Sequence, residues 1–131
     1  HPYLVPVFEE MNMYLSSQVT ERLVKEKHIE ICPLEYMRGR NFHNSFIILD
    51  EAQNATYEQI KMLITRMGSK SKCVINGDID QSDLSSNLRG GLEECLDRLD
   101  NLRGVGLVEL ERCDIIRNKL IARVLDRLVD E

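Results

Sequence analysis

The hydrophobic and polar positions of this chain follow two alternating periods, one typical of helices and the other of strands. The segments with helical character are residues 2–14, 17–27, 56–67, 90–99 and 115–130. The short apolar runs typical of strands are residues 29–32, 46–49, 73–75 and 105–110. Polar, irregular segments lie between them, chiefly at 34–45 and 79–87. The pattern therefore predicts short strands separated by helices.

The predicted helix at 56–67 has clear start and stop signals. Thr56 and Gln59, three residues apart, form a capping box, and Gly68 is expected to end the helix. The apolar residues expected to face the core are Ile60, Leu63, Ile64 and Met67 here, and Leu92, Leu96 and Leu99 in the helix at 90–99.

Strands that alternate with helices of ten or more residues indicate βαβ units, so the predicted fold class is α/β with a parallel sheet. The unbroken apolar run at 46–49 is typical of a strand buried on both faces. Right-handed crossovers place the carboxyl ends of parallel strands on one edge of the sheet, where ligands of open α/β sheets bind. We therefore expect Asp50, Glu51 and Asp78, which follow two of the strands, to lie at a ligand edge.

The length and charge of the chain exclude several classes of protein. Its 131 residues fit one domain, and 17 basic against 22 acidic residues give a net charge of −5. This acidic balance argues against a protein that coats DNA by charge alone, although it leaves room for a local basic groove. No apolar run approaches the roughly 20 residues that span a bilayer, and no signal peptide is visible. We expect a cytoplasmic protein without a membrane partner.

The four cysteines and three histidines show none of the close pairs that zinc sites use. A disulfide framework is not expected either, because a chain of this length can form an aliphatic core without one. We expect four reduced thiols, at Cys32, Cys73, Cys95 and Cys113.

The sharpest motif is the apolar run at 46–49 followed by Asp50 and Glu51, which is the Walker B pattern of P-loop nucleoside triphosphatases. A rigid buried strand would aim Asp50 at one point, where its carboxylate can hold Mg²⁺ through the water shell of the ion. Glu51 would point elsewhere and orient or deprotonate the water that attacks the γ-phosphate of ATP. The alternative is a pair of acids that stabilises the start of a helix by about 0.3–1 kcal/mol.

A second motif, from Gly77 to Gln81, follows the next predicted strand. Glycine allows the backbone to approach a phosphate closely, and a neutral glutamine can hydrogen-bond both a γ-phosphate oxygen and an attacking water. The alternative is a glycine–aspartate turn with a surface glutamine. Because both motifs fall on the same predicted sheet edge, together they favour a nucleotide site.

Three arginines are candidates for phosphate contacts. Arg117, near the start of the last predicted helix, could neutralise charge that develops in a transition state. Arg38 and Arg40 flank Gly39, and their two guanidinium groups could grip the phosphates of a nucleotide or nucleic acid. The alternative for each arginine is a solvated surface position.

Three segments, taken in order, resemble the PhoH-like ATPases of bacteria and phages. They are PLEYMRGR at 33–40, FIILDEAQN at 46–54 and GDIDQSDL at 77–84. The opening HPYL and the late DIIR at 114–117 also resemble family segments, so the resemblance covers nearly the whole chain.

The resemblance implies a RecA-like P-loop fold, related to superfamily 1 helicases, with ATP and Mg²⁺ as ligands. Asp50 would then serve Mg²⁺, Glu51 would be the catalytic acid, and Gln81 would sense the γ-phosphate. Arg117 would be an arginine finger, although Asn118 stands where the family has a histidine.

The resemblance also implies a role for Gln53 and Asn54, which follow the two acids as in the family and would couple nucleotide state to a neighbour. The implied activity is ATP hydrolysis coupled to RNA or single-stranded nucleic acid. A homo-oligomer is expected, because an arginine finger that acts across subunits requires one, and rings are common among RecA-like ATPases.

One family feature is missing, since no phosphate-binding loop of the form GxxxxGK[ST] occurs in the sequence. The family carries that loop upstream of the segment that opens this chain. We therefore expect residues 1–131 to be the carboxyl-terminal part of a single ATPase domain, and to bind ATP weakly or not at all by themselves.

Two alternatives to an ATPase stay open. A truncated ATPase could serve as a non-enzymatic interaction module, which the missing loop motivates. A two-metal nuclease has less support, because its acids would stand in a Walker B context. The acids that such a nuclease would use are Asp50, Glu51, Asp78, Asp80 and Asp83.

Overall fold

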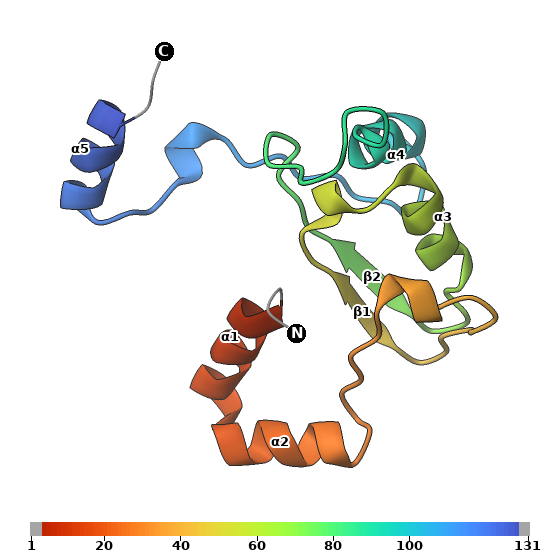
Figure 1. Ribbon diagram of the computed structural model, residues 1–131. Coiled ribbons are helices and arrows are strands. Elements are labelled where there is room, and N and C mark those ends of the chain that lie inside the picture. The colour runs from red at the N-terminus through yellow and green to blue at the C-terminus, as the bar shows by residue number, and fades with distance from the viewer. Residues whose placement is uncertain (1–3, 129–131) are drawn as a thin grey trace. The chain divides into compact units, whose positions relative to one another are not determined.

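The chain forms two compact units, His1–Leu99 and Asp100–Glu131. The computed structural model describes residues 4–128 (Figure 1). Among these residues the first unit contains two strands, four α-helices and two short 3-10 helices, and the second contains one α-helix and one short 3-10 helix.

A βαβ unit lies at the centre of the first unit. Strand β1 (Phe46–Leu49) pairs in parallel with β2 (Lys72–Ile75), so that Phe46 lies opposite Lys72 and Leu49 opposite Ile75. Helix α3 (Tyr57–Thr65) connects the two strands. The predicted α/β class and parallel pairing are therefore confirmed, in a sheet of two strands.

The core lies between this sheet and helices α3 and α4 (Gly91–Leu99), which cover one of its faces (Figure 1). Ile60 of α3 is completely buried. The other buried members of the core cluster are Ala52, Ala55, Leu92 and Cys95. Burial raises the pKa of the Cys95 thiol, and the carboxylate of Glu94 raises it further.

The prediction that the strand at 46–49 is buried on both faces is wrong. Side chains alternate between the two faces of a sheet, and Phe46 and Ile48 are 66% and 48% exposed, whereas Ile47 and Leu49 are half-buried. The reason is that the helices of the first unit cover only one face of the two-stranded sheet.

The predicted capping box of α3 is confirmed. The Thr56 hydroxyl accepts the N–H of Gln59 at 3.2 Å, and the Gln59 side chain accepts the N–H of Thr56 at 2.9 Å. We expect Thr56→Ala to lower the free energy of unfolding by about 1 kcal/mol, because α3 loses an oxygen that satisfies its first turn. Urea denaturation of the chain measures this change.

The matched control for the cap is Thr65→Ala at the other end of α3. The Thr65 hydroxyl is exposed and donates to the carbonyl of Met62 within the same helix. We expect a change within about 0.5 kcal/mol there. Equal losses in the two variants would contradict the capping role of Thr56.

Two details of the predicted helices are wrong. Helix α3 ends at Thr65 rather than at Gly68, whose lack of a side chain instead makes room for His43; a Cβ at this glycine would lie 2.1 Å from the His43 ring. In α4 the buried residues are Gly91, Leu92 and Cys95, whereas Leu96 is 37% exposed.

The amino-terminal part folds as the two helices predicted there, α1 (Val5–Leu15) and α2 (Ser17–Lys25), which pack on each other. Residues 2 and 3 of the first predicted helix lie outside the described residues. The strand predicted at 29–32 is wrong, since this segment is irregular and pairs with no strand in the described chain.

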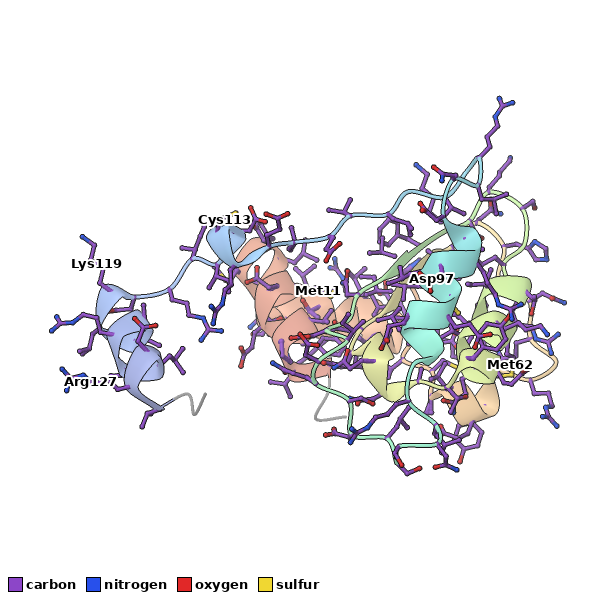
Figure 2. The ribbon with its side chains drawn as sticks, turned by 90° about the horizontal axis from the view of Figure 1, so that it is seen from above. Met11, Met62, Asp97, Cys113, Lys119 and Arg127 are labelled. Atoms are coloured by element: carbon purple, nitrogen blue, oxygen red, sulfur yellow. The ribbon has the colours of Figure 1, made fainter. Side chains whose placement is uncertain are left out.

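In the second unit, the strand predicted at 105–110 is wrong. The segment is irregular and exposed, because an apolar run becomes a strand only when a neighbour takes its backbone hydrogen bonds, and no strand of residues 4–128 does so. Helix α5 (Lys119–Leu128) forms within the predicted 115–130, of which residues 129 and 130 lie outside the described part (Figure 2).

The described residues contain no helix that is long and apolar enough to cross a membrane. All four cysteines are free thiols, and burial also raises the pKa of Cys73. A raised pKa keeps a thiol protonated and therefore weakly reactive.

Candidate functional site

The carboxyl ends of β1 and β2 meet at one edge of the sheet, as the two motifs predicted. The N–H of Asn76 donates to the carbonyl of Leu49, and the N–H of Ala52 donates to the carbonyl of Asn76, both at 2.9 Å. The segment after β1 therefore lies against the segment after β2. We call residues 50–54 and 76–83 the edge site.

Asp50 and Glu51 leave β1 in a strained turn. The half-buried Asp50 accepts the N–H of Glu51 through Oδ1 at 3.0 Å. Glu51 is exposed and has φ of 53°, the left-handed region that costs a non-glycine residue about 1–2 kcal/mol. Such strain persists where the surroundings impose it, and it often marks a functional position.

Gln53 is the centre of the hydrogen bonds in the edge site. Its side chain is 5% exposed. The amide Nε2 donates to Oε2 of Glu51 at 2.5 Å, and Oε1 accepts the N–H of Asp78 at 3.0 Å. The Ser82 hydroxyl donates to the backbone carbonyl of Gln53 at 2.9 Å.

The loop that carries Gln81 is fixed at both ends. At the carboxyl end of this loop, Asn54 Oδ1 accepts the N–H of Asp83 at 2.7 Å. The N–H of Gln81 donates to the carbonyl of Asp78 at 3.1 Å in a turn. The Gln81 side chain is exposed and makes no hydrogen bond within residues 4–128, so it is free to meet a ligand.

Gly77 is required at this edge because of close packing rather than a special backbone angle. A Cβ there would lie 2.6 Å from Cδ2 of Leu92 and 3.0 Å from Oε1 of Gln53. The glycine therefore lets β2 end directly against Gln53. A cavity of about 310 Å³ opens beside this contact, with Ser82 and Arg89 in its wall.

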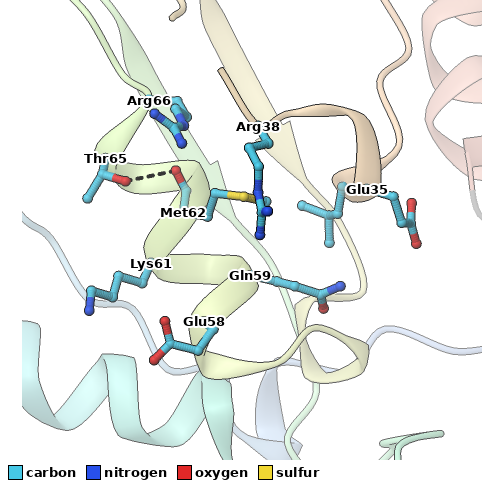
Figure 3. Close-up of a pocket in the computed structure, with 9 residues that line it drawn as sticks. Glu35, Arg38, Glu58, Gln59, Lys61, Met62, Thr65 and Arg66 are labelled. Carbon is cyan, nitrogen blue, oxygen red and sulfur yellow. Dashed lines mark hydrogen bonds between the residues drawn. The ribbon is translucent and has the colours of Figure 1, made fainter. Parts of the chain in front are cut away.

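Arg38 lies in a different place from the edge site. It lines an open pocket of about 580 Å³ along α3, which shares no residue with 50–54 or 76–83 (Figure 3). Arg66 and Lys61 line the same pocket together with two acids, Glu35 and Glu58. Basic and acidic side chains alternate there, so the pocket is not a purely basic groove.

Arg40 is already engaged by other residues of the first unit. Its Nη1 donates to Glu30 at 2.5 Å, and its guanidinium lies 5.0 Å from the centre of the Phe42 ring. This hydrogen bond lowers the pKa of Glu30 and raises that of Arg40. Arg38 and Arg40 therefore do not form one two-pronged grip.

Arg117 belongs to the second unit, where it is exposed in the irregular segment before α5. Its predicted role as an arginine finger stays a prediction.

The acids of the edge site are not arranged as a metal-binding cluster. Within the described part of the chain no three histidine, cysteine or acidic side chains gather closely enough to hold a metal ion. A Mg²⁺ ion held through its own waters would need fewer protein ligands: Oδ1 of Asp50 accepts the Glu51 N–H, and the other carboxylate oxygen could accept from a water of the ion. Magnesium commonly keeps several waters and uses only one or two protein carboxylates.

The sequence pointed to the acids and to Gln81, but not to how they are held. Gln53 and Asn54 drew attention only through the resemblance, and Ser82 drew none. No local pattern could have found these contacts, because each joins residues 25 or 29 positions apart.

Comparisons with known proteins agree with the sequence motifs. The family model described as PhoH-like protein matches residues 1–128. Over 125 residues the chain is 41% identical to a PhoH-like protein of Bacillus subtilis (strain 168) and 39% identical to one of Mycobacterium tuberculosis (strain ATCC 25618 / H37Rv). It is 38% identical over 126 residues to Protein PhoH of Escherichia coli (strain K12).

These alignments cover the chain and its relatives unequally. They include 95% of this chain but only 39%, 36% and 36% of the three relatives. The chain thus spans less than two fifths of the length of the curated relatives it matches.

Proposed function

Because the chain belongs to the PhoH-like protein family, we propose that the protein carrying it is an ATP hydrolase. One observation supports the proposal most: the two acids after β1 and the glutamine loop after β2 share one sheet edge and are joined through Gln53. A sheet edge of this kind is where α/β proteins bind ligands.

The proposed roles follow from the chemistry of the edge site. Mg²⁺, when bound, would neutralise charge on the phosphates. Asp50 would hold a water of that ion, and Glu51 would accept a proton from the attacking water. Gln81, whose side chain is exposed, would hydrogen-bond the γ-phosphate. Arg117 would supply positive charge as an arginine finger.

The proposal includes the fold of the complete domain. Residues 1–131 would form the carboxyl-terminal part of a RecA-like P-loop domain, and the phosphate-binding loop would come from outside this chain. By itself the chain would then bind ATP weakly or not at all. We place the protein in the bacterial cytoplasm, or in the host cytoplasm if a phage encodes it.

We further propose RNA or single-stranded nucleic acid as the partner of the ATPase, in a homo-oligomer. Arg38 is a better candidate than Arg40 for a phosphate contact, because Arg40 would first have to leave Glu30.

The test of the proposed function is steady-state ATP hydrolysis by the protein expressed from its complete coding sequence. We expect Mg²⁺-dependent phosphate release that rises when single-stranded RNA or DNA is added. No release above that of a buffer blank, with or without nucleic acid, would overturn the proposal. It would favour the second candidate, a non-enzymatic interaction module.

A further inference from the structure

We propose that Gln53 is a positioning residue that couples the carboxylate of Glu51 to the loop carrying Gln81, within one chain. This inference rests on the proposed ATP hydrolysis. It concerns how a γ-phosphate bound at Gln81 would affect the position of Glu51, the residue proposed to activate water.

The side-chain amide of Gln53 makes two hydrogen bonds, one as a donor and one as an acceptor. Its Nε2 donates to the Glu51 carboxylate, and its Oε1 accepts the N–H of Asp78. Turning the amide over would face a donor with a donor and an acceptor with an acceptor. The partners therefore fix the amide in a single orientation.

Burial and packing hold the amide in this place. Gln53 is 5% exposed, and Gly77 lies so close that a Cβ there would be 3.0 Å from Oε1. Hydrogen bonds are stronger in such a setting than in water. The Glu51 carboxylate thus has a fixed partner, although Glu51 itself is exposed.

The loop from 78 to 83 depends on the same segment. The side chain of Gln53 accepts the N–H of Asp78, the first residue of the loop, and the Gln53 carbonyl accepts from the Ser82 hydroxyl. The Asn54 side chain accepts the N–H of Asp83, the last residue of the loop. Gln81 lies between these anchors. The N–H of Gln81 donates to the carbonyl of Asp78, so hydrogen bonds connect Gln81 through Asp78 and the Gln53 amide to Glu51. Contact of Gln81 with a γ-phosphate would act on Glu51 through these bonds.

The inference distinguishes two substitutions of Gln53. Glutamate keeps the size and an oxygen for the Asp78 N–H, but it loses the donor and places a second carboxylate beside Glu51. Alanine loses both contacts. Gln53→Glu should thus separate the link to Glu51 from the link to the loop.

The test measures ATP turnover by the protein from its complete coding sequence and amide hydrogen exchange at Asp78. We expect both Gln53 variants to lower kcat about 10- to 100-fold with KM changed less than about threefold, since a small misplacement of a catalytic group costs about this much. The Asp78 amide should exchange faster in Gln53→Ala but stay protected in Gln53→Glu.

Two controls isolate the effect. Gln18→Glu makes the same chemical change at an exposed position of α2 and should leave kcat and Asp78 exchange unchanged. Asn54→Ala releases Asp83 but leaves the Gln53–Glu51 contact in place, so we expect a smaller fall in kcat than in Gln53→Ala. Circular dichroism checks that each variant is folded. If Gln53→Ala unfolds, the kcat of Gln53→Glu still tests the role of Gln53.

The possible failures are distinct. Absence of ATP hydrolysis by the unchanged protein would overturn the proposed function. Hydrolysis by the unchanged protein, together with a wild-type kcat in a folded Gln53 variant, would overturn only the role of Gln53. Unchanged Asp78 exchange in Gln53→Ala would also overturn it, because the amide would then not hold the loop.

Discussion

Glu51→Gln is expected to lower ATP turnover by about 10³-fold while nucleotide affinity stays within a few fold of the unchanged protein. A general base contributes typically 10²–10⁴ to a rate, and an amide cannot accept the proton. The substitution keeps the size of the side chain, and the amide oxygen can still accept from Gln53. Steady-state kinetics and a nucleotide titration measure the two quantities.

A matched substitution controls for the loss of one negative charge. Glu9→Gln changes an exposed glutamate of α1, well away in sequence from the edge site, and should leave turnover unchanged. Turnover that is unchanged in Glu51→Gln as well would remove Glu51 from the proposed mechanism. A parallel loss of affinity would indicate that Glu51 serves binding rather than water activation.

Gly91→Ala is expected to destabilise the first unit by about 2–3 kcal/mol. A Cβ at this position, the first residue of α4, would lie 2.4 Å from the backbone N of Tyr57 and 2.8 Å from the backbone carbon of Thr56. Backbone atoms cannot turn aside as a flexible side chain can, so α4 would have to move away from α3. Domains are stable by only about 5–15 kcal/mol in total, so the loss would be plain in urea denaturation.

Gly106→Ala is the matched control for this prediction. A Cβ there would meet nothing within 4 Å, and the residue is exposed. We expect a change within about 0.5 kcal/mol. Equal stability of the Gly91 and Gly106 variants would contradict the close packing of α3 and α4.

The βαβ unit could be predicted because its signals are local. The apolar run at 46–49 and the Thr56–Gln59 capping box specify a strand and a helix start within a few residues each. Parallel pairing then follows from the connection through a helix. For the same reason the meeting of Asp50 and Asp78 at one sheet edge was predictable.

The errors arose where a partner far along the chain decides the outcome. The run at 105–110 has the composition of a strand, yet among the described residues no neighbour takes its hydrogen bonds. The composition of 46–49 likewise suits burial on both sides, whereas helices cover only one. Neither fact is encoded in the segment itself.

The candidate site shows the same limit. Its charged residues have a recognisable order in the sequence, but the orientation of the Gln53 amide depends on a backbone N–H 25 residues away. The same holds for Asn54 and Ser82, each of which reaches 29 residues along the chain. The RecA-like fold and the role of Arg117 remain proposals.

The most direct test of the proposed nucleotide site is a titration with a fluorescent ATP analogue, with and without Mg²⁺. We expect saturable, Mg²⁺-dependent binding by the protein from its complete coding sequence, weakened about tenfold or more in Asp50→Ala because a charge-assisted contact is lost. The 131-residue chain alone should show no saturable binding. Binding by the complete protein that needs neither Mg²⁺ nor Asp50 would contradict this assignment. Tight Mg²⁺-dependent binding by the chain alone would contradict the proposal that the phosphate-binding loop lies outside it.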